Sequence, residues 1–283
     1  MSILHAVVLG AVQGLTEFVP VSSSGHLVLL HRVFGIDEPT LFFDVMLHGG
    51  TLLAVFVVLW RDIWAILQRP IQPLTGFLIL GTIPAIIAAL VFRGPIEQAF
   101  ETGRFLGFSF LITSMLLCCG ELLYRRGRTA GTLRRSGEMN WRTINWYAMN
   151  WQNALFIGVF QAVAILPGVS RSGATITGAL SCGLNRELSA RFSFLLSIPA
   201  ILGALVLHLN EMAAKGMTEE AVNSSIPLAA MIAGTVTAAI VGFFAVKFML
   251  KIIREKSLFG FAIYTAALGT LVLIDQFGTR FVF

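Results

Sequence analysis

Two short stretches of the chain combine charged residues with serine and glycine inside otherwise apolar sequence. The first, QGLTEFVPVSSSGH (13–26), contains Glu17 and His26, and the second, LPGVSRSGAT (166–175), contains Arg171. An ionisable residue at membrane depth is costly, so it is a candidate for function. Glycine lets the backbone approach a ligand, serine donates hydrogen bonds, and the first N–H groups of a helix attract an anion. This combination favours a phosphate-binding site.

The charged and polar side chains each suit one part of phosphate chemistry. Arg171 stays charged at any relevant pH and can bind phosphate oxygens in a bidentate fork, neutralising charge as the bond to the leaving phosphate breaks. Ser23 can act as a nucleophile with His26 as its proton partner, although direct attack by water is equally compatible with these residue types. Gln13 and Glu17 lie four residues apart on one helical face and predict a hard divalent metal ion, Mg or Ca.

The remaining polar and glycine positions of the two stretches are predicted to bind the substrate: Ser22, Ser24, Gly25, Ser170, Ser172, Gly173 and Thr175. Asp44 and His48 share one helical face and either support the site from behind or mark a membrane interface. Single residues also have purely structural interpretations, because serine caps helices, glycine eases helix packing and a buried Glu can pair with Arg.

An internal repeat indicates which elements position these residues. The segment GAVQGLTEFVPVSSSGH (10–26) aligns without gaps on GVFQAVAILPGVSRSGA (158–174), and a weaker match pairs Gly81 with Gly234. The two copies place charge asymmetrically, which the symmetry of a scaffold would not demand. Three apolar segments follow each copy, and because three is odd, the second copy enters the membrane from the opposite face. The sequence therefore predicts an inverted-topology repeat.

Composition indicates a membrane protein, since 56% of the residues are hydrophobic and 12% are charged, against about 25% charged in ordinary soluble domains. Spans are predicted at about 41–60, 75–92, 105–123, 190–208, 227–246 and 258–275. The repeated stretches are too short to span and predict re-entrant helix-loop-helix hairpins at about 3–35 and 152–184, whose tips (20–26 and 167–173) meet near the midplane. The predicted fold is all-α and integral to the membrane, with six transmembrane helices and two re-entrant hairpins.

Charge distribution divides and orients the chain. We expect a first repeat at 1–124, a basic cytoplasmic linker at 125–151 and a second repeat at 152–283. Most Lys and Arg residues fall on the side that includes the linker, so both chain ends are expected outside. The net charge of +5 is explained by these loops, and no nucleic-acid partner is predicted. The three cysteines lie in apolar sequence without metal-like spacing and are predicted to be structural.

The two polar stretches resemble the two signatures of the undecaprenyl-diphosphate phosphatase (BacA/UppP) family. FDVMLHGGTLLAV (43–55) and ARFSFLLSIPAILGA (190–204) also look like that family, so the resemblance covers essentially the whole chain. It implies hydrolysis of undecaprenyl diphosphate to undecaprenyl phosphate and inorganic phosphate, with recycling of the lipid carrier for cell-wall synthesis and bacitracin resistance. It also implies a divalent cation and a multi-pass protein of the bacterial inner membrane, with its site facing the extracytoplasmic side.

Transferred residue by residue, the resemblance implies that Glu17, Ser23, His26 and Arg171 are catalytic. Gln13 stands where many members have a second Glu, which removes a charge from the expected metal site. Asn153 stands where members often have Asp, and we group it with the supporting residues. The expected partners are the polyprenyl diphosphate substrate and membrane lipid, and a homodimer is also considered.

Two rival interpretations belong to other classes. A polyprenyl-phosphate transporter or flippase would use the same architecture, since inverted repeats with broken helices are typical of transporters. A second family of membrane lipid phosphatases also has a Ser-Gly-His string, but the chain lacks the Ser-Arg followed by His-x-x-x-Asp that this family would require.

Overall fold

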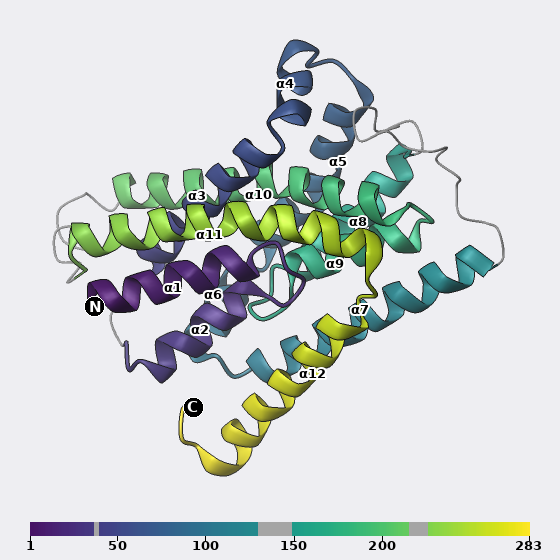
Figure 1. Ribbon diagram of the computed structural model, residues 1–283. Coiled ribbons are helices and arrows are strands. Elements are labelled where there is room, and N and C mark those ends of the chain that lie inside the picture. Colours follow the sequence, from purple (N-terminus) through teal and green to yellow (C-terminus); the bar gives the residue numbers. More distant parts are fainter. Residues whose placement is uncertain (37–39, 130–148, 215–225) are drawn as a thin grey trace.

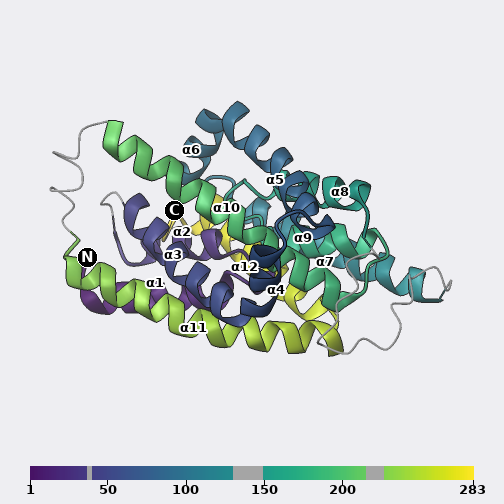
Figure 2. The ribbon, with the colours of Figure 1, turned by 90° about the horizontal axis from the view of Figure 1, so that it is seen from above.

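The computed structural model describes residues 1–36, 40–129, 149–214 and 226–283, and every regular element within these ranges is a helix. In chain order these elements are α1 (Ile3–Thr16), α2 (Ser23–Val33), α3 (Leu41–Val58), α4 (Trp60–Gln68), α5 (Pro73–Val91), α6 (Arg93–Thr102), α7 (Leu106–Thr129), α8 (Trp151–Val163), α9 (Arg171–Ser181), α10 (Arg186–Ala214), α11 (Leu228–Glu255), α12 (Phe259–Ile274) and the π-helical η2 (Asp275–Thr279). Figures 1 and 2 show α1 lying along α11, and α7 crossing the molecule beside α12.

Five of the described helices are long and apolar enough to cross a membrane, namely α5, α7, α10, α11 and α12. A sixth crossing results if α3 and α4 are counted as one broken span. Five of the six predicted spans coincide with these five helices, and the sixth, at 41–60, coincides with α3. The chain therefore has the helical content and apolar helices of a multi-pass membrane protein.

The break between α3 and α4 was not anticipated from the sequence. The predicted span at 41–60 was continuous, whereas the chain bends by 79° after Val58. Beyond the bend, Asp62 accepts a hydrogen bond of 3.1 Å from Arg191 of α10. This ion pair ties α4 to α10 beyond the bend.

The repeated stretches form two pairs of short helices, α1 with α2 and α8 with α9. The four helices have 14, 11, 13 and 11 residues. At 1.5 Å per residue none of them reaches the roughly 30 Å thickness of a hydrocarbon core. Their outer limits agree within a few residues with the hairpins predicted at 3–35 and 152–184.

Glycine contacts join each short pair to the long helices. A Cβ atom on Gly10 of α1 would lie 2.2 Å from the carbonyl oxygen of Gly234 in α11, and one on Gly158 of α8 would lie 2.6 Å from that of Gly81 in α5. A larger residue would therefore separate either pair of helices. The sequence alignment equates Gly10 with Gly158 and Gly81 with Gly234, so equivalent residues make matching contacts in the two halves.

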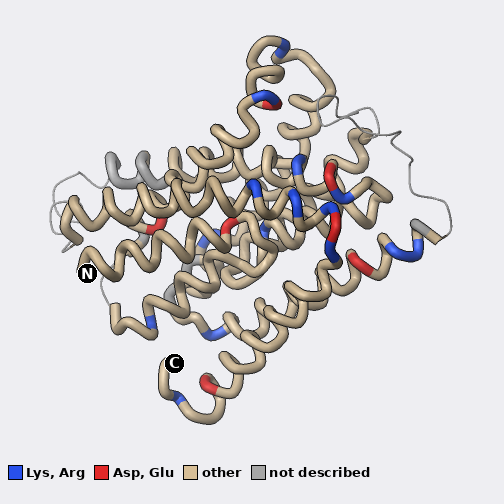
Figure 3. Tube along the Cα trace, viewed as in Figure 1, with Lys and Arg blue, Asp and Glu red and all other residues tan. Residues whose placement is uncertain are grey.

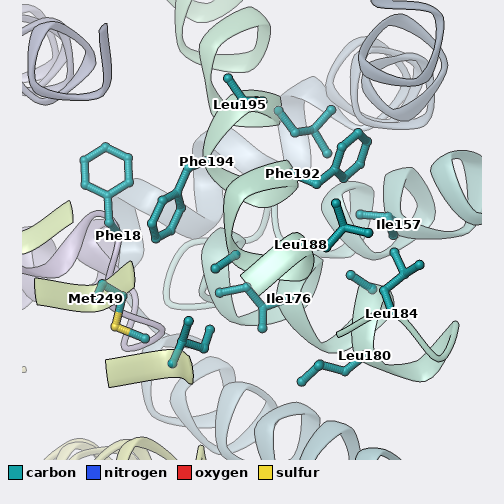
Figure 4. Close-up of a cluster of buried hydrophobic side chains, with 14 of the residues drawn as sticks. Phe18, Ile157, Ile176, Leu180, Leu184, Leu188, Phe192, Phe194, Leu195 and Met249 are labelled. Atoms are coloured by element: carbon teal, nitrogen blue, oxygen red, sulfur yellow. The ribbon is translucent and has the colours of Figure 1, made fainter. Parts of the chain in front are cut away.

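A large group of buried apolar side chains supports the polar loops (Figure 4). It includes Ile176 and Leu180 of α9, Phe192 and Phe194 of α10, and Phe18. The rings of Phe18 and Phe194 pack edge to face with centroids 5.3 Å apart. Because Phe18 follows Glu17 in sequence, this packing fixes the backbone from which the glutamate extends.

Charged residues gather where α7 and α11 end and α10 begins (Figure 3). The ion pairs there join Glu121 to Arg125 and Arg186, Asp62 to Arg191, and Glu187 to Arg191 and Arg254. All these segments belong to the side on which the sequence analysis placed most basic residues.

The predicted linker at 125–151 falls mainly on residues 130–148, which lie outside the described residues. Its first residues continue α7, which stays helical to Thr129. The division into a first repeat at 1–124 and a second repeat at 152–283 stays a prediction.

Candidate active site

Glu17 lies where the two polar stretches meet. It directly follows α1, and only 5% of its surface is exposed. Its Oε2 atom accepts hydrogen bonds from Gln13 Nε2 at 2.9 Å and from Ser23 Oγ at 2.5 Å. The acid, the amide and the hydroxyl predicted from the first stretch therefore form one hydrogen-bonded group.

Arg171 reaches this group from the other half of the chain. It is the first residue of α9, and its Nη2 atom forms an ion pair with Glu17 Oε1. Its Nη1 atom is buried without a hydrogen-bond partner in the described structure. Leaving a buried donor unpaired costs free energy. One side of the guanidinium thus holds the glutamate, and the other is free for an anion.

His48 approaches the same carboxylate from α3. Its Nδ1 atom lies 2.7 Å from the backbone oxygen of Asp44, so Nδ1 carries the proton that it donates. Its Nε2 atom lies 3.6 Å from Glu17 Oε2, the oxygen that also accepts from Ser23. The structure therefore brings His48 to the site.

The side chain of Asp44 points elsewhere. It accepts a hydrogen bond of 3.2 Å from Thr40 and lies 3.5 Å from His31 Nε2. Asp44 contributes to the site through its backbone oxygen, which orients His48.

Serine side chains begin the second helix of each pair. Ser22 accepts a hydrogen bond of 3.3 Å from the N–H of Gly25, and Ser170 accepts one of 3.1 Å from that of Gly173. Ser22 also has a φ of 70°, in the left-handed region that residues other than glycine seldom adopt. These two predicted substrate-binding serines therefore have a structural task as helix caps.

The loops around these serines touch each other. Ser172 donates a hydrogen bond of 3.1 Å to the backbone oxygen of Val19, and Ser24 accepts one of 3.5 Å from the N–H of Gly168. A Cβ atom on Gly25 would lie 3.0 Å from the Cα atom of Gly168. The segments 20–26 and 167–173 are therefore in direct contact, and glycine permits the close approach.

His26 has different partners from those the sequence suggested. Its Nδ1 atom lies 2.6 Å from the backbone oxygen of Ser22, and its Nε2 atom lies 2.7 Å from the hydroxyl of Tyr264 in α12. We paired Ser23 with His26 from their spacing, whereas in the structure the Ser23 hydroxyl donates to Glu17. Ser23 and His26 are only three residues apart in sequence, but this spacing does not determine where the imidazole ring of His26 points.

Asn153 lies away from this group of residues. It forms a capping box with Asn150 at the start of α8, in which each side chain accepts from the backbone N–H of the other residue. Its position thus has a local structural explanation. The structure does not bring it into contact with Glu17 or Arg171 by any described hydrogen bond.

Three residues beside the site were not singled out from the sequence. Thr113 of α7 accepts from the N–H of Ser170 at 3.0 Å and donates to the carbonyl oxygen of Gly168 at 3.2 Å. The hydroxyls of Ser193 and Thr175 lie 2.6 Å apart. Tyr264 is the third. Polar residues in predicted spans were the available signal, but many such residues bond only to their own helix, so type alone does not identify these three.

The two predicted ligands of a divalent cation, Gln13 and Glu17, lie side by side at this site. Among the described residues, no group of three or more His, Cys, Asp or Glu side chains could hold a metal. The predicted pair is Gln13 and Glu17, and the Oε1 atom of Gln13 is buried without a hydrogen-bond partner. One carboxylate and one free amide oxygen suit a magnesium ion that takes its other ligands from water and phosphate.

Comparison with known proteins gives a consistent result over the whole chain. The family model described as "Bacitracin resistance protein BacA" matches residues 6–271. The undecaprenyl-diphosphatase of Carboxydothermus hydrogenoformans is 43% identical over 99% of this chain and 100% of its own length. Undecaprenyl-diphosphatase 4 of Bacillus thuringiensis subsp. konkukian is 41% identical over 98% of each chain. The undecaprenyl-diphosphatase of Geobacter sulfurreducens is 39% identical over 98% of this chain and 99% of its own length.

Proposed function

The chain belongs to the BacA family, and on this premise we propose that it is an undecaprenyl-diphosphatase. The reaction is hydrolysis of undecaprenyl diphosphate to undecaprenyl phosphate and inorganic phosphate. Relatives that carry this name match over almost their full length. The proposal includes the recycling of the lipid carrier for cell-wall synthesis and resistance to bacitracin.

The observation that carries the proposal is that only one of the two terminal nitrogen atoms of the Arg171 guanidinium has a partner. Its Nη2 atom binds Glu17, while its Nη1 atom is buried and unpaired. A phosphate oxygen placed at Nη1 would satisfy that donor. The same phosphate would lie near the Ser23 hydroxyl, because Ser23 and Arg171 share the Glu17 carboxylate. Substrate binding and attack on phosphorus are thus assigned to adjacent groups.

In the proposed mechanism Ser23 attacks the terminal phosphorus. Its hydroxyl gives its proton to Glu17 as Oγ forms the new bond. The bond between the phosphorus and the bridging oxygen breaks, and that oxygen leaves with the lipid phosphate, which takes the proton from Glu17. Glu17 then accepts a proton from the water that attacks the phosphoserine. It returns this proton to Ser23 as inorganic phosphate leaves.

The other predicted residues support these steps. Arg171 stabilises the charge on the phosphoryl oxygens as the bond breaks. The N–H groups at the start of α2 and α9, with the serines beside them, are assigned to hold the diphosphate. His26 contributes to catalysis by holding the loop, because it forms a hydrogen bond with the backbone of Ser22, next to the nucleophile Ser23.

A divalent cation, Mg or Ca, is part of the proposal. Gln13 Oε1 and Glu17 would hold it, and when bound it would neutralise negative charge on the diphosphate. The charge balance supports this assignment. Glu17 already offsets the Arg171 charge, so the pair alone leaves a diphosphate group uncompensated.

We also propose the finer architecture predicted from the sequence, with two re-entrant hairpins in an inverted repeat. Short helices, contacting loops and the equivalent glycine contacts at Gly10 and Gly158 support it. We place the protein in the bacterial inner membrane, with the linker cytoplasmic and the site open to the extracytoplasmic side. The partners are the lipid substrate and membrane lipid, and a homodimer is retained as a hypothesis.

Phosphate release by the purified protein tests the function. The wild type should release inorganic phosphate from undecaprenyl diphosphate, and Ser23→Ala should not. Rapid acid quenching with a substrate labelled in the terminal phosphate should leave label on wild-type protein. The exposed Arg104→Ala is a matched surface control and should behave as wild type. Turnover without labelled protein would favour water as the nucleophile.

Two further results would count against parts of the proposal. Full activity after treatment with a chelator would contradict the role of a divalent cation. Activity that is lost with the chelator and restored by Mg²⁺ would support that role. A protein that moves polyprenyl phosphate across vesicles but releases no phosphate would overturn the phosphatase and favour the transporter.

A further inference from the structure

The imidazole of His26 is held at both of its nitrogen atoms. Nδ1 faces the backbone oxygen of Ser22 at 2.6 Å. A carbonyl oxygen can only accept, so Nδ1 must carry a proton and donate it. In the neutral ring Nε2 then has a lone pair, which accepts from the Tyr264 hydroxyl at 2.7 Å. The Ser22 carbonyl thus fixes the tautomer, and the Tyr264 hydroxyl holds the nitrogen that remains an acceptor.

Ring contacts fix the plane of the same imidazole. The Tyr264 ring stacks on it with an interplanar angle of 6° and centroids 5.8 Å apart. Phe110 of α7 meets it edge to face at 5.5 Å. Tyr264 is 46% exposed on α12, yet its hydroxyl is turned inward to His26. An exposed aromatic residue on a membrane helix has no packing reason to place its polar end on a buried ring.

We infer that Tyr264 is a positioning residue of the active site, acting on the nucleophile through His26 and the backbone of Ser22. The argument rests on the proposed function for its kinetic consequence. Ser22 has a φ of 70°, and the next residue, Ser23, presents its hydroxyl to Glu17. The His26 bond to the Ser22 carbonyl holds this strained residue in place.

This arrangement assigns the second half of the chain a part in the chemistry of the first half. Arg171 supplies charge from α9, and Tyr264 supplies a hydrogen bond from α12, 238 residues from His26 in sequence. His26 is thereby removed from direct proton exchange with Ser23, because neither of its nitrogens is free. The proton acceptor left for Ser23 is Glu17.

Tyr264→Phe tests the inference, because it removes the hydroxyl and retains the stacked ring. We expect kcat to fall about tenfold, on the order of one hydrogen bond lost to a working group, with KM nearly unchanged. Tyr124→Phe is the matched control, since the Tyr124 ring faces the Arg186 guanidinium in a distant cluster. It should leave both constants unchanged. In a His26→Gln background, Tyr264→Phe should have no further effect.

The ring nitrogens of His26 give a readout independent of turnover. In protein labelled with ¹⁵N-histidine, the wild-type signal that His26→Gln removes should report Nδ1 protonated and Nε2 hydrogen-bonded. Tyr264→Phe should move the Nε2 signal, and Tyr124→Phe should not. An unchanged His26 spectrum together with unchanged kcat would overturn the inference. If wild-type protein released no phosphate but the spectrum responded as expected, the proposed function would fail while the hydrogen bond from Tyr264 to His26 stood.

Discussion

Two buried glutamates in this molecule meet arginine in opposite ways. Glu121 of α7 is 1% exposed and accepts from Arg186 at 2.6 and 2.8 Å, from Arg125 at 2.7 Å and from the N–H of Leu258 at 3.1 Å. Arg186 also donates to the carbonyl oxygen of Lys256. Among the described residues, no buried side-chain nitrogen or oxygen of Glu121, Arg125 or Arg186 lacks a hydrogen-bond partner.

Glu17 has as many contacts but leaves its neighbours unsatisfied. Gln13 Oε1 and Arg171 Nη1 are both buried without hydrogen-bond partners. A saturated buried ion pair has no capacity to bind anything else, and breaking it leaves an uncompensated charge. An unsaturated pair carries a cost that a ligand can remove. The difference supports the proposal that Glu17 belongs to a binding site, whereas Glu121 joins helices.

The largest expected effect is on turnover, from changing the arginine of the unsaturated pair. Arg171→Lys keeps the positive charge but replaces the planar fork by a single ammonium group. We expect kcat to fall roughly 10²–10³-fold, as when one preorganised hydrogen-bond donor to a transition state is removed. Phosphate release measures the turnover of the variant, and its melting temperature shows whether it is folded. Near-normal turnover by Arg171→Lys would contradict the role of the fork.

A smaller effect, on stability, is expected from Glu121→Gln. The change keeps the volume but leaves the Arg186 guanidinium, 12% exposed, without its counter-charge. Breaking such a pair should cost about 3 kcal/mol, or roughly 6–12 °C in melting temperature. The turnover of the folded fraction should not change. Thermal unfolding in detergent measures this, with the exposed Glu255→Gln as control. Loss of activity without loss of stability would refute the structural role of Glu121.

Much of the fold could be predicted because lipid imposes simple rules on length and polarity. An apolar run near 20 residues identified the five helices that are long enough to span, and α3 of the broken pair. The bend after Val58 could not be predicted, because the length of an apolar run does not show where a span breaks. The ion pair beyond the bend joins Asp62 to Arg191, which lies 129 residues away in sequence. Local sequence specifies a helix and its apolar face, but the partner of that face is decided by tertiary packing.

The charged residues of the candidate site could also be predicted, because a charge in apolar sequence is costly. Glu17 and Arg171 stood out as ionisable residues in repeated apolar sequence, and the structure brings them together. The repeat gave no signal for Tyr264, which lies outside both motif stretches. Glu121 was not singled out either, although it lies within a predicted span. Its saturation by Arg186 and the Leu258 backbone is visible only once α7, α10 and α12 are placed.

The smallest expected effect is on the melting temperature, and it distinguishes the two arginines that pair with Glu121. Arg125 is 56% exposed, whereas Arg186 is 12% exposed. An ion pair open to solvent contributes about 0–1 kcal/mol, because water and salt screen it. Arg125→Gln should therefore lower the melting temperature by no more than a few degrees, and high salt should reduce the difference from wild type. Arg186→Gln should cost several times as much at any salt concentration. Equal losses from the two variants would mean that the network acts as one unit and that burial does not rank its members.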